Sequence, residues 1–393
     1  MSMIPPVGKL YGNGEDGVKS VSGSETLNTY KACVGTATQN YVTVASGDEA
    51  AFTAGDLVLI IKMRGETTTA VGTRELATVS ATSDTKVTLT SNLVNTYQDS
   101  GDDQSQIILV PQYTTFSCPT GQTLTGTAWN ATTGLGGVIA IMADTSITIN
   151  AGTITGDGLG YKGGAQAGAG TPGHQGEGDA GPAGDHSQSA NGTGGGGGDN
   201  GEPGQGGGGG GFGAAGSASE GTAAAGGTTG GAADMATLIP GGAGGSGGGE
   251  DNGNNQGGAG GDSGLIIFLM SKIVTIENSA DITNAGASGS NGTIGGDVEG
   301  AGGGGGGSGG AIWLQGEVID YGTDLMDCTA GAKGSGSGNA GKDGGAGAVG
   351  RIRVDYATSV TGSTSTPAAS ENEDSDLLYR EDVVSENSGF YLC

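Results

Sequence analysis

The sequence predicts an all-β fold: a small N-terminal β barrel or sandwich, then a β-solenoid-like or elongated-sandwich framework that carries glycine-rich, polyglycine-II-like excursions. Short apolar runs recur along the chain, and none has a helical period of useful length. Glycine supplies 90 of the 393 residues and is concentrated between about residues 156 and 350. Only 9 prolines and no strict Gly-X-Y period are present, which disfavours collagen.

Residues 1–112 are predicted to form the N-terminal β domain. Phe52–Arg64 contains a Gly-Asp turn followed by an aliphatic run, and residues 75–81 and 86–90 alternate apolar and polar positions, as half-buried strands do. Residues 106–111 add an apolar run that ends at a proline. Short strands separated by turn signals favour a small barrel or sandwich.

Residues 113–358 are predicted to form a framework of four degenerate copies of one β unit, the fourth of them partial. One unit cannot bury its own apolar face, whereas stacked units can, which favours a β-solenoid or an elongated sandwich. A glycine-rich excursion follows each of the first three copies, so we expect the excursions to leave from one edge. The copies begin at Gly136, Ser263, Gly309 and Ala348, and the excursions are residues 157–262, 287–308 and 332–346.

The excursions have two interpretations. A glycine chain loses much backbone entropy on ordering, which favours a disordered linker. The alternative is a bundle of polyproline-II-like glycine helices, whose free N–H and C=O groups bond to neighbouring helices. Isolated apolar residues in the first excursion favour the bundle, because a flexible linker has no need of them. These residues are Tyr161, Phe212, Met235, Leu238 and Ile239.

The chain is strongly acidic. It has 14 Lys and Arg against 41 Asp and Glu, a net charge of −27. Nucleic acid and anionic membrane surfaces are therefore disfavoured as partners. Residues 359–393 are predicted to be a polar, acidic C-terminal tail, with a Ser/Thr/Ala-rich linker at Ser359–Ser370.

No feature of the sequence predicts secretion by a signal peptide or insertion into a membrane. Residues 1–9 lack the charged start and apolar core of a signal peptide, and no apolar run approaches the roughly 20 residues that span a bilayer. Intracellular proteins, substrates of specialised exporters and virion proteins released by lysis remain as the expected classes.

No motif predicts a cofactor, a metal ion or a catalytic centre. The cysteines, Cys33, Cys118, Cys328 and Cys393, form no CxxC pair, which disfavours zinc, although disulfides, including an intermolecular one through Cys393, stay open. Residues 336–343 nearly match a phosphate-binding loop but lack its Ser or Thr. The aspartates of the glycine-rich region are too irregularly spaced for a calcium repeat. A glycosidase carboxylate pair on different rungs of a solenoid stays open.

The two histidines, His174 and His186, lie in the long excursion. They are interpreted either as solvated loop residues or as ligand contacts. Nucleophilic catalysis requires a base beside a nucleophile, and no such motif is recognisable. We therefore expect a protein that is not an enzyme.

Several segments resemble modules of phage tail and baseplate proteins and of large bacterial surface proteins. The segments are residues 14–17, 106–113, 121–125, 128–130, 136–138, 309–314 and 350–354. The glycine-rich regions are similar in composition to the receptor-recognising adhesins at the tips of T-even-like phage tail fibres. That resemblance implies a polyglycine-II sandwich whose connecting loops bind the bacterial surface. This chain departs from the family in its larger β framework and its longer first excursion.

The resemblance implies a non-enzymatic virion protein, a tail-fibre or adhesin component, located on the extracellular particle. The N-terminal β domain is expected to bind other virion proteins, and loop tips are expected to bind a host surface glycan or outer-membrane protein. Tyr161, His174, His186 and Phe212 are the expected receptor contacts. A homo-oligomer, a trimer by resemblance, is expected. The alternatives are a purely structural virion decoration, collar or capsid-fibre protein, a bacterial cell-surface or filament subunit, and a solenoid polysaccharide-degrading enzyme.

Overall fold

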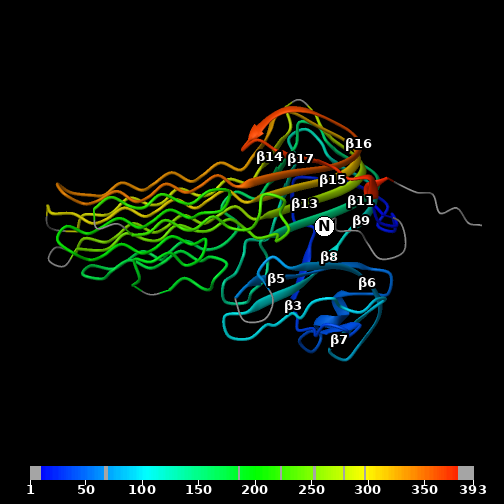
Figure 1. The fold of residues 1–393 in the computed structure, drawn as a ribbon, viewed down its shortest axis with the longest axis horizontal. Helices are drawn as coiled ribbons and strands as arrows, with labels where there is room; N and C mark the ends of the chain where they lie inside the picture. Colours follow the sequence, from blue (N-terminus) through cyan, green and yellow to red (C-terminus); the bar gives the residue numbers. More distant parts are fainter. Residues whose placement is uncertain are drawn as a thin grey trace, which may run out of the picture.

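The computed structural model describes residues 10–65, 70–184, 186–221, 224–250, 254–277, 279–295 and 298–378. These residues form two β-sheets and a glycine-rich lobe that projects from them to one side (Figure 1). Helix is limited, in this part of the chain, to two short 3-10 turns, η1 (Asp48–Ala51) and η2 (Ser375–Leu377). The all-β prediction is confirmed.

The smaller sheet has six antiparallel strands in the order β3-β8-β5-β6-β7-β4. Their bounds are β3 (Thr29–Ala32), β4 (Tyr41–Thr43), β5 (Leu57–Arg64), β6 (Arg74–Ser83), β7 (Lys86–Leu89) and β8 (Gln104–Val110). An isolated bridge between Val34 and Thr43 connects the chain beyond β3 to β4, so the sheet closes into a small barrel. Phe52 and Tyr97 fill its core.

Strand β5 is buried along its whole length, and its first five residues form a continuous aliphatic run. Val58 and Ile60 face the core of the barrel. Leu59 and Ile61 face the opposite way, into a second core shared with the framework and the base of the lobe. The barrel is therefore packed against the rest of the molecule through an apolar face.

The larger sheet has eleven strands, and every pairing in it is parallel. The path is β1-β9-β11-β13-β15-β14-β12-β10-β2, with β16 beside β15 and β17 beside β16. The bounds are β1 (Val18–Ser20), β2 (Ser24–Glu25), β9 (Gln112–Cys118), β10 (Thr123–Thr125), β11 (Val138–Ile149), β12 (Thr153–Thr155), β13 (Ile266–Ile276), β14 (Asp281–Thr283), β15 (Ala311–Asp327), β16 (Arg351–Thr366) and β17 (Ser370–Glu373).

The predicted repeat units stack in register, which confirms the solenoid-like framework. Val138 pairs with Ile266, Ile266 with Ala311, and Ala311 with Arg351, so the starts of the four units align. The chain leaves the sheet after β12, β14 and β15 and returns at β13, β15 and β16. Each glycine-rich excursion therefore connects one rung to the next, from the same side of the sheet.

The sheet topology divides the chain differently from the predicted boundaries. Strands β1 and β2 lie within residues 1–112 but pair with β9 and β10 of the framework. The linker expected at Ser359–Ser370 is wrong, because β16 continues to Thr366 and β17 begins at Ser370. Polar edge strands have no buried face along most of their length, so no apolar pattern marks them in the sequence.

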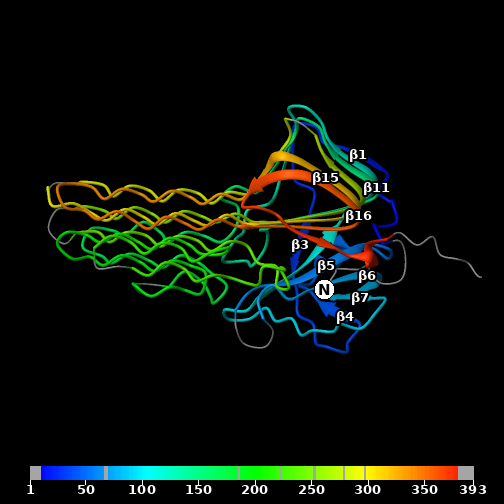
Figure 2. The same ribbon diagram turned by 45° about the horizontal axis from the view of Figure 1, so that its top comes forward.

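Within the lobe, extended segments run side by side and bond to one another through their backbones (Figures 1 and 2). In residues 302–310, every third amide donates to the same neighbouring segment. One set donates to residues 342–348, the second to residues 242–248 and the third to residues 284–290. This three-residue period is the one expected for packed glycine helices with three residues per turn.

Carbonyl groups of the same central segment accept from three further neighbours. Carbonyls within residues 300–308 accept from backbone amides of residues 204–210, 258–264 and 331–334. No room remains for side chains between these segments: a Cβ atom on Gly305 would lie 2.0 Å from the carbonyl oxygen of Gly208. Glycine is thus required here by close backbone approach.

Candidate functional site

Two of the expected receptor contacts lie at the base of the lobe, in the core shared with the barrel. Tyr161 is fully buried, and its hydroxyl donates to the carbonyl oxygen of Met63. Phe212 is 1% exposed, and its ring centroid lies 5.4 Å from the guanidinium carbon of Arg351. The expectation that these two side chains project from loop tips is wrong. Large apolar groups in a glycine-rich chain gather where the lobe meets an apolar surface.

The packing role expected of the isolated apolar residues is confirmed. Tyr161, Phe212, Met235, Leu238 and Ile239 are all at most 2% exposed and belong to one core cluster. That cluster also contains side chains of β5, β11 and β13. It fixes the base of the lobe on the β part of the molecule.

The two histidines lie together in the lobe. Their ring centroids are 5.1 Å apart. His186 is exposed, and its Nδ1 lies 3.0 Å from the carbonyl oxygen of Pro172, while His174 is half-buried and its backbone amide donates to Ser246. A role for this pair in receptor binding stays a prediction.

A buried charge cluster joins the barrel, the framework and the lobe. Glu177 of the lobe forms an ion pair with Arg64 of β5, and their side chains are 0% and 4% exposed. The indole Nε1 of Trp129 donates to the same carboxylate at 2.9 Å, and the backbone amide of Lys162 donates at 3.0 Å. Full burial with several partners gives this contact a defined geometry. The direction in which the lobe points is therefore set by specific contacts.

The far end of the lobe, the distal tip, is formed by the turns that connect outgoing and returning segments. The described residues of the tip are 199–203, 250, 254–255, 294–295, 298–300 and 338–341. Gly204 donates to the carbonyl of Gly300 at 3.1 Å, and Asn339 donates to that of Val298 at 2.8 Å. Asn255 donates to Glu250 at 2.8 Å. The tip is thus a connected surface of several turns, not a set of independent loops.

Three carboxylates meet at the distal tip. Side-chain oxygens of Glu202, Glu250 and Glu299 lie within 4.8 Å of one another. Glu250 is fully buried, whereas the other two are exposed. Carboxylate oxygens are ligands for hard cations such as Ca²⁺, so these residues are the group in the described chain best placed to hold one. Sequence spacing could not reveal this group, because its members come from three separate turns.

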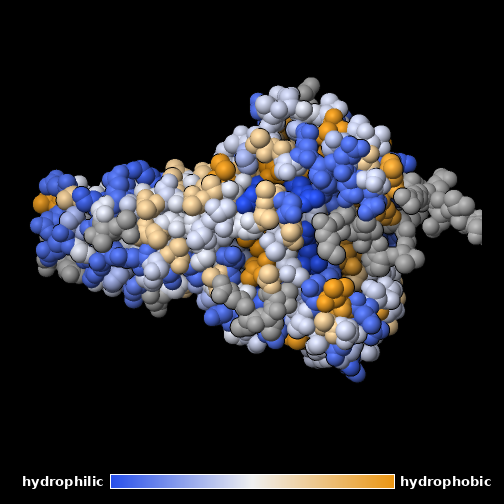
Figure 3. All heavy atoms as spheres, in the orientation of Figure 1, coloured by the Kyte–Doolittle hydropathy of each residue, from blue (hydrophilic) through white to orange (hydrophobic). Residues whose placement is uncertain are grey.

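Apolar side chains are exposed on the turns that carry or adjoin these carboxylates. Val298 precedes Glu299. Ile294 precedes Gly295, whose amide donates to Asn255, the partner of Glu250. Ile294 is 51% exposed and Val298 is 67% exposed. Figure 3 shows an apolar spot at the end of the lobe, among polar atoms. A partner that covered these two side chains would remove their apolar surface from water, which favours binding. The sequence contained one signal for this site, an Ile and a Val within a tract otherwise made of Gly, Ser, Asn, Thr and acids.

A hollow lies on the framework and is lined by residues at the end of β13 and within β15. Its volume is about 360 Å³, and it is lined by Thr275, Ile276, Glu277, Asp320 and Gly322. Glu277 directly follows β13 and Asp320 lies on β15, so these two carboxylates come from neighbouring rungs.

The three cysteines in the described part of the chain, Cys33, Cys118 and Cys328, are buried as free thiols. Burial raises the pKa of each thiol above its ordinary value. Because the thiolate is the reactive form, these groups are suited to packing and not to nucleophilic chemistry. The disulfide considered through Cys393 involves a residue outside the described part.

No protein-family model and no curated protein sequence matches this chain. One solved structure with similarity is the Gp54 tailspike of Acinetobacter baumannii bacteriophage AP22 in complex with A. baumannii capsular saccharide, with 12% identity and a TM-score of 0.19 over 36% of this chain and 27% of that one. Another is the tailspike protein gp49 from Pseudomonas phage LKA1, with 9% identity and a TM-score of 0.18 over 89% of this chain and 65% of that one.

This chain thus spans 27% and 65% of the lengths of these two tailspikes. Because both TM-scores are low, neither likeness bears on the function of this chain. Within the described residues, no helix has the length and apolar character to cross a membrane.

Proposed function

We propose that this chain is an attachment protein of a phage particle, a tail-fibre or adhesin component whose distal tip contacts the host surface. The observation that carries the proposal is the exposure of Ile294 and Val298 beside three carboxylates, at the end of a lobe that projects away from the barrel. The resemblance to glycine-rich fibre-tip adhesins supports it. The receptor contacts are then tip residues, in place of the buried Tyr161 and Phe212.

The lobe is proposed to be a polyglycine-II sandwich that serves as a rigid support. Its three-residue hydrogen-bond period supports this assignment. A preorganised tip loses little conformational entropy on binding, which favours affinity. Several copies on one particle, as in a trimeric fibre, would add avidity without new contacts. The receptor is proposed to be a surface glycan or an outer-membrane protein.

Binding of the purified, fluorescently labelled chain to a panel of bacterial cells tests the proposal. We expect the double variant Ile294→Ser, Val298→Ser to lose at least about tenfold in affinity, because exposed apolar groups at a contact supply much of its binding energy. The matched control is Val18→Ser, Val94→Ser, which replaces two valines that are 76% and 75% exposed on the β part. Equal binding by both double variants would refute a role for the tip.

The particle itself supplies a second test. Immunogold electron microscopy of purified phage with antibody against the chain is expected to label the tail or its fibres. Labelling of bacterial filaments in the absence of phage would favour the filament-subunit alternative, and labelling of the capsid or collar would favour the structural alternative.

We also propose that the chain acts by binding and has no catalytic activity. Incubation of the purified protein with host surface polysaccharides should release no oligosaccharides. Glycan release that is lost in Glu277→Gln and Asp320→Asn would instead assign a glycosidase site to the framework hollow that these two residues line.

A further inference from the structure

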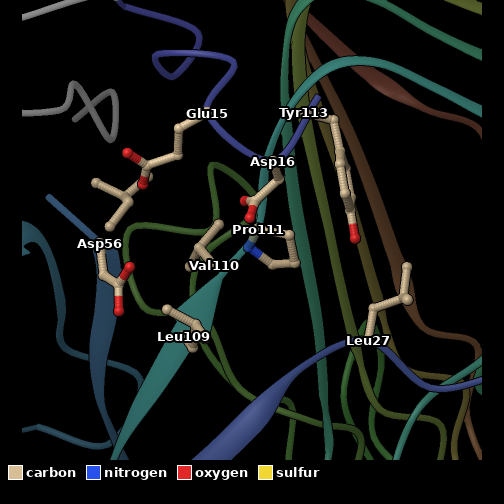
Figure 4. A pocket seen from close by; sticks show the side chains of 9 residues that line it. Glu15, Asp16, Leu27, Asp56, Leu109, Val110, Pro111 and Tyr113 are labelled. Atoms are coloured by element: carbon tan, nitrogen blue, oxygen red, sulfur yellow. The ribbon is translucent and has the colours of Figure 1, made fainter. Parts of the chain in front are cut away.

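A cavity lies where the N-terminal segment crosses the junction between the barrel and the framework. Its volume is about 160 Å³, and its lining includes residues from β5, β8 and the start of β9. Figure 4 shows Glu15 and Asp56 on one side of it, Tyr113 and Leu27 on the other, and Asp16 with Pro111 between them. The cavity therefore combines a carboxylate group with an apolar wall.

Hydrogen bonds hold the three carboxylates of this cavity in place. Asp16 accepts from the backbone amide of Gln112 at 2.6 Å, and Glu15 accepts from the side-chain amide of the same residue at 3.2 Å. Asp56 accepts from the backbone amide of Thr53 at 2.7 Å. All these donors are neutral. Within the described chain, none of the three carboxylates forms an ion pair, so no described cation compensates their negative charges.

The wall of the cavity is apolar. Val110 is 1% exposed and Leu57 is 2% exposed, and both line the cavity together with Pro111. Tyr113 is 8% exposed, and burial, with Asp16 and then Glu25 nearby, raises the pKa of its phenol to about 12. The phenol is therefore neutral at ordinary pH, and the site offers apolar surface next to fixed negative charge.

We propose that this cavity receives a lysine or arginine side chain from a partner protein. The aliphatic stem of such a side chain would lie along the apolar wall while its cationic end meets the carboxylates. Opposite charge at a docking site steers the partner and fixes its register. The proposal rests on the proposed function in one respect: the partner is taken to be a component of the particle, because the cavity adjoins the barrel and not the lobe.

The same geometry disfavours a metal ion as the occupant. Ca²⁺ takes six to eight oxygen ligands, and Mg²⁺ requires a near-octahedral set. The wall formed by Leu27, Leu57, Val110 and Pro111 supplies no side-chain oxygen. Carboxylates on one side of an apolar cavity match an elongated cation better than a small, fully coordinated one.

Titration of the full-length, ¹⁵N-labelled chain with single amino-acid amides tests the proposal. The probes are Nα-acetyl-lysine amide and Nα-acetyl-arginine amide, and Nα-acetyl-norleucine amide is the uncharged control. The reporter is the backbone amide of Gln112, because it donates to Asp16. We expect a saturable shift with at least one cationic probe, with a Kd of about 1 mM, and none with the norleucine amide.

Matched variants separate the site from general electrostatic attraction. Asp16→Asn keeps the hydrogen-bond acceptor but removes the charge, and it should weaken binding about tenfold. Asp84→Asn removes one charge from an exposed turn of the barrel and should change affinity less than about twofold. Three results would overturn the proposal. They are an equal loss of probe affinity in both variants, an equal shift with the norleucine amide, and the absence of a saturable shift with either cationic probe.

Two further outcomes would assign the cavity to another occupant. Displacement of the lysine amide by lower concentrations of Ca²⁺ would make it a metal site. Tighter probe binding in Lys9→Gln would assign it to the N-terminal segment of this chain. Cell binding by Asp16→Asn keeps this test separate from the proposed function: we expect it to equal the parent chain, because the distal tip is unchanged.

Discussion

At the scale of single residues, glycine is required in the lobe by the distance between backbones. A Cβ on Gly305 would meet the carbonyl oxygen of Gly208 at 2.0 Å, whereas a Cβ on Gly181 would meet nothing closer than 3.9 Å. We expect Gly305→Ala to destabilise the protein by about 1–3 kcal/mol, as overpacking does. Gly181→Ala should be neutral or stabilising by up to about 1 kcal/mol, because it reduces the freedom of the unfolded chain.

Thermal and urea unfolding of both glycine variants measures this difference. Comparable stability of the two variants would mean that the segments around Gly305 separate easily, and that the hydrogen-bond lattice does not hold them.

Another contact at this scale is the ion pair between Arg64 and Glu177. Glu177→Gln keeps acceptor capacity for Trp129 and Lys162 but leaves the guanidinium of Arg64 buried without a counter-charge. We expect a loss of about 3–5 kcal/mol in the free energy of unfolding. Tryptophan fluorescence during urea unfolding follows this change, because Trp129 lies at the cluster.

The matched control for Glu177 is an exposed ion pair of the lobe. Glu220 pairs with Lys333 at 3.0 Å, and its side chain is 59% exposed. Glu220→Gln should cost no more than about 1 kcal/mol, because solvent screens such pairs. Similar losses in the two variants would contradict the assignment of Glu177 as the contact that fixes the lobe.

At the scale of elements, the glycine segments form one hydrogen-bonded lattice if every backbone amide donates to a neighbouring segment. All nine amides of residues 302–310 donate to neighbouring segments. Hydrogen exchange should therefore be slow at every one of them, and not at alternate positions as on the edge of a sheet. Backbone NMR after transfer to D₂O measures the rates. Exchange at the rates of an unfolded chain would restore the disordered-linker interpretation of the excursions.

The elements that the sequence predicted best are those with buried apolar faces. The strands that start at Val138, Ile266 and Ala311 each contain an aliphatic run. This repeat in the sequence predicts that the strands align in the sheet, and they do. Strands β1, β2 and β17 were missed because they are short, polar and largely exposed. Their position depends on backbone pairing with distant strands, which side-chain patterns do not record.

The candidate site was harder to predict than the fold. Tyr161 and Phe212 are large aromatic residues in a glycine-rich chain, and their apolar character buries them in the core and not at the loop tips. The residues of the distal tip come from turns far apart in the sequence, such as Glu202 and Glu299. These residues are close together because the glycine segments that carry them end at the same place. Where each segment ends is known only from the packed lobe.

At the scale of the whole molecule, the net charge of −27 should govern how fast the protein meets its host. Bacterial surfaces that carry anionic glycans repel such a chain over a distance set by the Debye length, about 30 Å at 0.01 M salt and about 8 Å at 0.15 M. We therefore expect the association rate with cells to rise several-fold over this range. A short-range apolar contact at Ile294 and Val298 should leave the dissociation rate nearly unchanged.

Surface plasmon resonance with immobilised outer-membrane vesicles measures both rates. The variant Ile294→Ser, Val298→Ser should show faster dissociation and the same dependence of association on salt, since it keeps the net charge. A fall in the association rate with added salt would contradict like-charge repulsion and would point to a cationic receptor that the tip carboxylates Glu202 and Glu299 attract. The sign of the salt dependence thus distinguishes an anionic host surface from a basic receptor.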